Sequence, residues 1–194
     1  ARIGQADVVS EVKSYLAKQA GAEQGEPYLA VIHRLDQPVE GVLVFAKEKK
    51  SAAVLTKQLS AGTLNKQYYA VLCGYPDCPE GDLVDYLRKE GNVAVAVTGR
   101  EQEFADAKIA ALHYRILEEI NDPSPLALAD VTIGTGRFHQ IRVQFASRKH
   151  PLAGDGKYGS RVKGSIALQS CGLQFLHPET GKPMACLLYT SPSP

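Results

Sequence analysis

The sequence lacks several features that would assign a class at once. It has no Trp and a single Met among 194 residues, and no apolar run of the roughly 18 residues that a membrane span needs. Neither sign of charge is in excess, because 22 Lys and Arg stand against 21 Asp and Glu, a formal net charge of +1. No membrane association is expected, and net charge alone does not select a nucleic acid or an acidic partner.

Cysteine is scarce as well. The four Cys residues follow no CxxC spacing, so a disulfide framework is not predicted, and a reducing cytoplasm is the expected location. A zinc site made of Cys73, Cys78 and His113 is a weak alternative, because the paired spacing of zinc ligands is missing. No metal is therefore expected.

The two ends of the chain differ in character from the rest. The chain begins at Ala1 without Met or a secretion signal, and we expect an N-terminally truncated domain. Residues 186–194, CLLYTSPSP, turn abruptly into a Ser/Pro tail, which we expect to be irregular and treat as a candidate non-native segment. Residues 1–185 are long enough for a single domain with a real core.

Extended segments dominate the pattern of apolar residues. Helices are predicted over 8–19, where Asp7 can cap, over 50–62, and over 138–150, with Phe138, Ile141, Phe145 and Ala146 on one side. Strands are predicted over 28–35, 41–47, 65–76, 82–89, 93–99, 126–136 and 166–178, whereas 107–119 is ambiguous between strand and helix. Without a βαβ rhythm, we predict an α+β fold with a largely antiparallel, mixed β-sheet and a few flanking helices.

Charge is distributed unevenly along the chain. Residues 131–165 hold seven basic side chains and one acidic side chain, Asp155, whereas residues 77–130 hold twelve acidic and five basic ones. One face could therefore follow a phosphate backbone while the rest stays neutral or acidic.

The stretch VIHRLDQPVEGVLVFAK, residues 31–47, sets an Arg and an Asp against two apolar runs. Arg34 and Asp36 could be no more than a surface ion pair. A kinase catalytic loop is not supported, because the order is HRLD rather than HRD, and the DFG and Gly-rich motifs are missing. Asp36 falls where a strand is expected to end, a position that often carries chemistry.

A second constellation is GTGRFHQIRVQFASRKHPLAGDGKYG, residues 134–159. Arg137, His139, Gln140 and Arg142 crowd the predicted start of a helix, where backbone N–H groups favour an anion, although a solvated basic face would look the same. Arg142 interrupts the apolar stripe of that helix, so we expect it to point inward and to need a buried anionic partner.

The third constellation, NKQYYAVLCG, begins a predicted strand with Lys66 and Tyr68. Successive side chains of a strand point to opposite faces, so at most one of Tyr68 and Tyr69 belongs to the core. A Tyr at a sheet edge usually serves packing, but it can also be a platform for a nucleobase.

Taken in order, HRLDQPVEGVLVFAK, KQYYAVLCG, TGRFHQIRVQFASRKHPLAGDGKYG and IALQSCGLQFLHP resemble the motifs of the RluA-type pseudouridine synthase family. The resemblance runs from about residue 28 to about residue 182. It implies the catalytic-domain fold of that family and the isomerisation of uridine to pseudouridine in structured RNA, ribosomal RNA before tRNA. It also implies a monomer that uses no cofactor, because the bond exchange is internal to one nucleotide.

The resemblance assigns roles to single residues. Asp36 matches the catalytic carboxylate, which would either attack C1′ or remove a ribose proton, and the sequence does not choose between the two. Arg142 matches an Arg that pairs with this Asp, and Tyr68 matches a Tyr that stacks on the target uracil and takes part in late proton transfer. Arg34 matches an Arg that helps to displace the base from its stack.

The remaining basic and polar positions of the motifs are expected to contact RNA. They are His33, Lys66, Arg137, His139, Gln140, Arg148, Lys149, Lys157 and Arg161.

One departure and two alternatives remain. The loop after Asp36 carries Val39 and Glu40 where many family members have Thr-Ser, which adds a negative charge near the site. A retaining glycosidase shares the carboxylate chemistry and would need Glu40 as a second carboxyl group about 5 Å away. An RNA-binding module of the same fold without catalytic activity is the other alternative, against which the intact set of Asp36, Tyr68 and Arg142 speaks.

Overall fold

The structure is a computed structural model that describes residues 7–20, 25–100, 103–121 and 123–188. Its elements in chain order are α1 (Val8–Ala20), β1 (Ala30–Val31), β2 (Glu40–Gly41), β3 (Phe45–Ala46), α2 (Lys49–Ser60), β4 (Asn65–Cys73), β5 (Glu80–Glu90), β6 (Val93–Ala96), β7 (Lys108–Asn121), β8 (Pro125–Ile133), α3 (Gln140–Ala146), a 3-10 turn (Gly156–Tyr158), β9 (Leu168–Leu176) and β10 (Pro183–Leu187).

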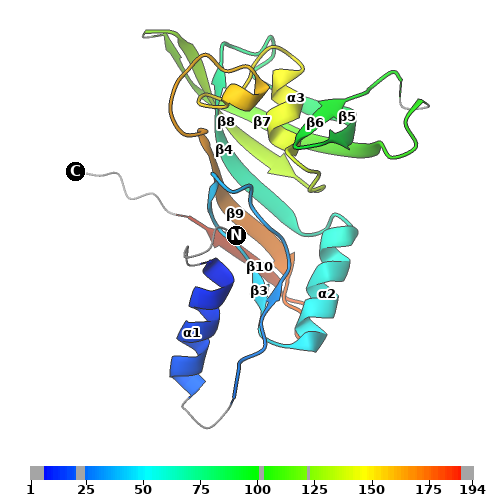
Figure 1. Ribbon diagram of the computed structural model, residues 1–194, viewed down its shortest axis with the longest axis vertical. Helices are drawn as coiled ribbons and strands as arrows, with labels where there is room; N and C mark the ends of the chain where they lie inside the picture. Colours follow the sequence, from blue (N-terminus) through cyan, green and yellow to red (C-terminus); the bar gives the residue numbers. More distant parts are fainter. Residues whose placement is uncertain (1–6, 21–24, 101–102, 122, 189–194) are drawn as a thin grey trace.

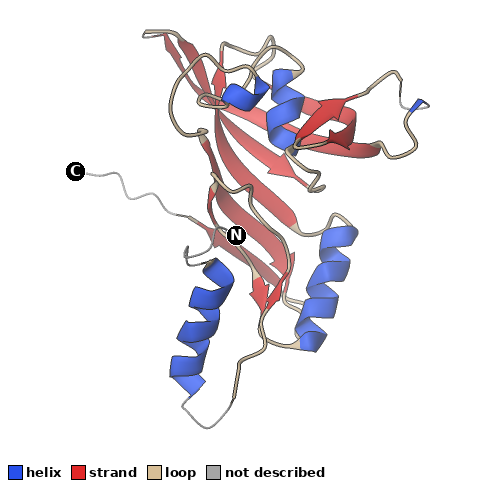
Figure 2. Ribbon diagram, viewed as in Figure 1, coloured by secondary structure: helices blue, strands red, loops and turns tan. Residues whose placement is uncertain are grey.

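An eight-stranded sheet forms the body of the molecule (Figures 1 and 2). The strand order is β10-β9-β4-β8-β7-β5-β6, and β2 joins by pairing with β9. Among the described strands, the β2–β9 pair is parallel and the other pairs are antiparallel. The predicted α+β class with a mixed, largely antiparallel sheet is therefore confirmed.

The central strands follow from their alternating side chains. In β4 every second residue from Lys66 to Leu72 is buried, and in β8 the buried positions run from Ala127 to Ile133 in the same alternation. Ile141 and Phe145 of α3 pack into the same core as Ala70 of β4 and Ala127 and Ala129 of β8. Helix α3 lies over one end of the sheet, while α1 and α2 lie towards the other end (Figure 1).

The helix predicted over residues 138–150 is shorter in the structure. It begins only at Gln140, because His139 takes the left-handed conformation with φ 53°, and it ends at Ala146. Phe138 therefore falls outside the apolar stripe in which it was placed. Its ring is 40 % exposed and stacks on the His139 ring, with 3.8 Å between the centroids.

Two predicted strands are much shorter than expected. The segment predicted over 28–35 pairs only at Ala30–Val31, with Phe45–Ala46 of the segment predicted over 41–47. Of the rest of 41–47, Gly41 pairs with Ser170 of β9 as part of β2. The loop that carries Asp36 lies between β1 and β2. The ambiguous segment 107–119 is a strand, β7.

The tail expected to be irregular from residue 186 is ordered at its start. Cys186 and Leu187 belong to β10, where they pair with Leu173 and Gly172 of β9. The Leu188 N–H then donates to the Cys171 carbonyl at 2.7 Å. Residues 189–194 lie outside the described residues, and the non-native origin of the tail stays a prediction.

Candidate active site

An open cavity of about 1090 Å³ lies between the Asp36 loop, the end of α2, the start of β4 and the start of α3. Its volume suits a bound nucleotide rather than a single ion. The residues predicted for the site that line it are His33, Arg34, Asp36, Lys66, Tyr68, Arg137, His139, Gln140, Arg142 and Lys157. Residues as far apart in the chain as His33 and Lys157 thus meet at one place.

Arg142 lies at the centre of the site, between two carboxylates. Its Nη1 donates to Asp36 Oδ2 at 3.1 Å, while Nε and Nη2 donate to the two oxygens of Asp155 at 2.7 and 2.8 Å. Arg142 is 6 % exposed and Asp155 2 % exposed. Burial alone would lower the pKa of Arg142, but its bonds to Asp155 and Asp36 raise it, so the guanidinium keeps its charge. The prediction of an inward-pointing Arg142 with an anionic partner is confirmed.

The Asp36 loop is held by close backbone packing against β9. Gly41 has φ 131°, and a Cβ at this position would lie 2.0 Å from the Ser170 carbonyl oxygen. The Val42 N–H donates to that same oxygen at 3.0 Å, and the Val39 N–H donates to the Asp36 carbonyl at 2.8 Å. A glycine is required at residue 41, because a side chain would push the loop away from the sheet.

His139 lies on the other side of the Asp36 carboxylate. Its Nδ1 is 2.8 Å from the Tyr158 hydroxyl, which accepts the Ala94 N–H at 2.7 Å. The Tyr158 proton is then free to go to Nδ1, which leaves the imidazole proton on Nε2, 3.7 Å from Asp36 Oδ2. Burial lowers the pKa of His139 although the Asp36 charge opposes this, so a neutral ring with its N–H towards Asp36 is favoured.

Tyr68 projects from β4 into the same space. It is 6 % exposed, and burial together with the charge of Asp36 raises its pKa to about 12. The phenol therefore stays protonated at neutral pH, as a proton donor and a ring surface.

Some of the predicted RNA-contacting residues have other partners. Arg148 bonds to Asp85 at 2.8 and 3.2 Å and is outside the cavity lining, but it is exposed, so its contact with RNA stays a prediction. Gln140 lines the cavity but is 3 % exposed, and its amide bonds to Thr135, to the Arg137 N–H and to the Ala111 carbonyl. These bonds hold the loop before α3, and the contact of Gln140 with RNA also stays a prediction.

The other basic residues form fewer bonds within the protein. Arg34 is exposed at the cavity, Arg137 donates from Nε to the Ile109 carbonyl, and Lys157 donates to the Asn92 carbonyl. Lys149 and Arg161 are exposed and outside the cavity lining, so a contact between either of them and RNA stays a prediction.

The glycosidase alternative finds no support in the site. Glu40, the second carboxyl group that it needs, is exposed in β2 and is not part of the cavity lining. Its neighbour Val39 does line the cavity, so the effect of the Glu40 charge on the site stays a prediction. Across residues 7–20, 25–100, 103–121 and 123–188, no three His, Cys, Asp or Glu side chains gather as a metal site would require, and no helix is long and apolar enough to cross a membrane.

Comparison with known proteins gives the family. Residues 3–147 match the family described as RNA pseudouridylate synthase. The chain belongs to this family. An uncharacterised RNA pseudouridine synthase of Bacillus subtilis is 33 % identical over 151 residues, covering 77 % of this chain and 48 % of the relative. The ribosomal large subunit pseudouridine synthase D of Xanthomonas campestris is 32 % identical over 177 residues, covering 81 % and 50 %.

Solved structures of the pseudouridylate synthase fold agree. Human RNA pseudouridylate synthase domain containing 4 superposes with a TM-score of 0.74 at 21 % identity, covering 95 % of this chain and 79 % of that one. Human RNA pseudouridylate synthase domain containing 1 superposes with a TM-score of 0.71 at 20 % sequence identity, and the match covers 84 % of this chain and 69 % of that one. The family and the fold predicted from the motifs are confirmed, and the chain spans about half the length of the curated relatives it matches.

Two residues of the candidate site are not predicted from the sequence. Asp155 and Tyr158 stand in the segment 154–159, from which only Lys157 is predicted to belong to the site. A signal existed for Asp155, because it is the only acidic residue among the seven basic ones of 131–165. An inward Arg142 with two free edges on its guanidinium needs more than one carboxylate.

Proposed function

We propose that this chain is the catalytic unit of an RNA pseudouridine synthase, with Asp36 as the catalytic carboxylate. The observation that carries the proposal is the Asp36 carboxylate, bonded to Arg142 at 3.1 Å and facing a nucleotide-sized cavity that Tyr68 also lines. The family of the chain supports the same reaction class.

The reaction exchanges bonds within one nucleotide. The C1′–N1 bond breaks, the uracil turns, a C1′–C5 bond forms, and the C5 proton is lost while N1 gains one. Asp36 would act either by attack on C1′ or by removal of a ribose proton, and both routes need an ionised carboxylate. Arg142 keeps Asp36 oriented without leaving its own charge unpaired, because Asp155 takes the other edge of the guanidinium.

The neighbouring side chains have complementary roles. Tyr68 would pack against the uracil and, as a protonated phenol, serve in the late proton transfer. Arg34, exposed at the rim, would fill the gap left in the RNA stack and so offset the few kcal/mol that extruding a base costs.

Ribosomal RNA is the substrate class that we favour over tRNA. The relative from Xanthomonas campestris is named for the large ribosomal subunit, and others with the same printed name match this chain. The monomeric state and the cytoplasmic location expected from the sequence stay predictions.

The test compares the 194-residue chain with its Asp36→Asn variant on ribosomal and transfer RNA, with pseudouridine mapped by carbodiimide-stop sequencing. We expect modification by the wild type and a fall of at least about 100-fold in the variant. Equal modification by the variant would remove Asp36 from the mechanism. A folded wild type that binds RNA but modifies none would support the non-catalytic RNA-binding module instead.

A further inference from the structure

Lys66 is a buried cation without a partner. It is 2 % exposed and lines the cavity, yet its Nζ forms no hydrogen bond or ion pair with any residue in the described part of the chain. The Nζ lies close to the backbone of the loop before α3, since a Cβ at Gly136 would be 2.9 Å away from it. A buried ammonium of this kind is unfavourable unless an anion reaches it.

His33 adds a second unused donor to the same cavity. It is 8 % exposed, and its Nε2 accepts the Val44 N–H at 3.4 Å, which puts the ring proton on Nδ1. In the described structure Nδ1 has no hydrogen-bond partner. Lys66 and His33, from β4 and the Asp36 loop, thus both line the cavity and each has a donor without a partner in the described protein, although the His33 Nδ1 atom itself is buried.

The charges of these groups at neutral pH define the ligand. Burial, and then the charge of Arg137, lowers the pKa of Lys66 to about 8, so the ammonium is still mostly protonated at pH 7. Burial and the charge of Lys66 lower the pKa of His33 to about 4, so its ring is neutral. The pair offers one positive charge and one N–H, which suits the oxygens of a singly charged anion.

The position of Lys66 relative to the reacting groups suggests which anion this is. Lys66 and Tyr68 project from the same face of β4 two residues apart, so their Cα atoms are about 7 Å from each other. With the uracil on Tyr68 and C1′ at Asp36, as in the proposed function, the ribose and its phosphate extend within the same cavity, which Lys66 also lines.

We propose that Lys66 and His33 bind the backbone phosphate attached to the ribose of the target uridine. The inference rests on the proposed function. Phosphate contacts position a nucleic acid without reading its sequence, so this pair would fix C1′ over Asp36 in any RNA. The phosphate would in turn give the Lys66 ammonium the partner that the protein does not supply.

The test uses uridine 5′-monophosphate, uridine 3′-monophosphate, uridine and inorganic phosphate as probes. NMR titration of the isotope-labelled lysines reports the pKa of Lys66. At least one of the nucleotides is expected to raise it by about one unit or more, and uridine to leave it unchanged. Lys66→Met should weaken binding of that nucleotide about tenfold and leave uridine affinity as it was. Lys50→Met, an exposed lysine on α2, is the matched control and should bind as the wild type does.

Two outcomes would overturn the inference. One is equal nucleotide affinity for the wild type and a Lys66→Met variant that is folded by circular dichroism. The other is a Lys66 pKa that responds to inorganic phosphate but to neither nucleotide. Failure of the proposed function would give a different result. No RNA would then contain pseudouridine after incubation, while nucleotides would still bind at Lys66.

Discussion

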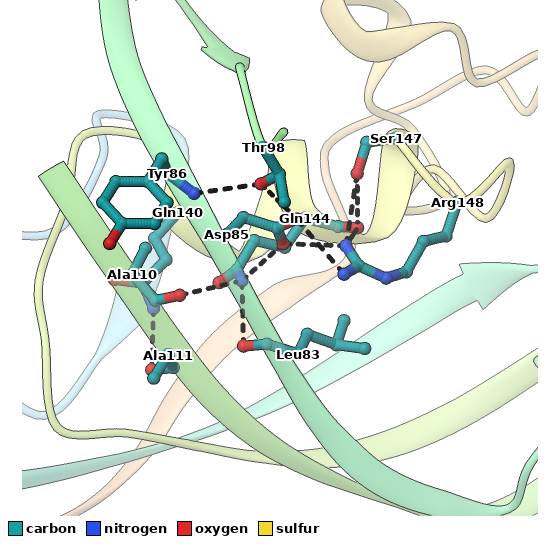
Figure 3. A network of polar contacts seen from close by, with 10 residues as sticks. All are labelled: Leu83, Asp85, Tyr86, Thr98, Ala110, Ala111, Gln140, Gln144, Ser147 and Arg148. Atoms are coloured by element: carbon teal, nitrogen blue, oxygen red, sulfur yellow. Dashed lines mark hydrogen bonds and ion pairs between the residues drawn. The ribbon is translucent and has the colours of Figure 1, made fainter. Parts of the chain in front are cut away.

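Helix α3 contributes Gln144 and Arg142 to two different groups of polar side chains, and the two groups differ in whether their charges are paired. Towards β5, Asp85 accepts hydrogen bonds from Arg148, Gln144 and Thr98 (Figure 3). Gln144 also donates to the Leu83 and Ala110 carbonyls, so one side chain connects the helix to β5 and β7. Both charges of this group, the Asp85 network, have a partner within the protein.

In the group that faces the cavity, not every polar side chain has a partner. Arg142 has two carboxylates, whereas the buried Nδ1 of His33 has no partner and the Lys66 side chain, 2 % exposed, has no carboxylate within ion-pair distance among the described residues. The same small domain thus pairs buried ions where it needs rigidity and leaves them open where a ligand is expected. The comparison teaches that a buried charge indicates a binding site through its missing partner and not through its burial.

The largest effect is expected from Arg142→Gln. It would leave Asp155, 2 % exposed, without its counter-ion, and breaking a buried pair from one side costs roughly 3–5 kcal/mol of unfolding free energy. Urea denaturation measures the unfolding free energy of the variant and of the wild type. The double variant Arg142→Gln/Asp155→Asn serves as the control, because it removes the stranded charge and should recover part of the loss. A double variant less stable than the single one would contradict this account.

Lys66→Met should change stability in the opposite direction. In the folded chain the pKa of Lys66 is lowered from 10.5 to about 8, which corresponds to a penalty on the order of 3 kcal/mol below pH 8. Between pH 8 and 10.5 the unfolded chain binds a proton that the folded chain does not, so wild-type stability rises with pH across this window. The variant should be more stable at pH 7 and lack this rise.

Denaturation of Lys66→Met, Lys50→Met and the wild type at pH 7, 9 and 11 checks this. A Lys66→Met variant less stable than the wild type at pH 7 would mean that Lys66 already has a favourable partner. The lowered pKa of His33, about 4, should add a separate rise in stability between about pH 4 and 6.5, measured by the same denaturation at those two pH values. This rise should be smaller in Lys66→Met, because the charge of Lys66 contributes to the lowered pKa.

Alternating strands and the inward Arg142 could be predicted because both are local patterns. Alternation in β4 and β8 follows directly from side-chain order, and a charged residue inside an apolar stripe must find a partner. The identity of that partner is not local. The sequence places Arg148 in a basic cluster, and its bond to Asp85, 63 positions earlier in the chain, is a product of the tertiary fold.

The misplaced boundaries have similar causes. Phe138 matches helical spacing, but His139 turns left-handed in front of the helix, which periodicity does not show. The segment 28–35 has strand composition, yet only two of its residues find a partner strand, because the following loop is packed on β9 through Gly41. Strand composition predicts an extended chain and not the pairing that makes it a strand.

Asp85→Asn tests the Asp85 network. Asp85 is 5 % exposed, and although burial raises its pKa, the bonds from Arg148 and Gln144 lower it overall. The amide keeps some of these bonds, and Arg148 can turn to water, so we expect a loss of about 1–3 kcal/mol at pH 7. The loss should shrink as pH falls through the lowered pKa of Asp85, because the wild type then also loses its carboxylate.

The control for Asp85→Asn is Asp82→Asn on the same strand. Asp82 is exposed and bonds only at the surface, to His113, so its removal should cost about 1 kcal/mol or less. Nucleotide binding at Lys66 should be unchanged in both variants. Equal losses of unfolding free energy for the two substitutions would mean that the Asp85 network stabilises the fold no more than a surface ion pair does.

The smallest effect is expected from Tyr158→Phe, which reaches the cavity through His139. The change removes the hydroxyl that accepts the Ala94 N–H and contacts His139 Nδ1, at a cost of about 1 kcal/mol. Without that hydroxyl only Asp36, 3.7 Å away, still favours the proton on Nε2, and ¹⁵N NMR should show a shift from the Nε2–H tautomer towards a mixture. Tyr69→Phe, on the opposite face of β4, is the control and should leave the His139 signals unchanged.

Because Nε2 lies 3.7 Å from Asp36, the tautomer change should lower the modification rate more than it lowers stability. An unchanged tautomer in Tyr158→Phe would mean that Asp36, and not Tyr158, orients the ring.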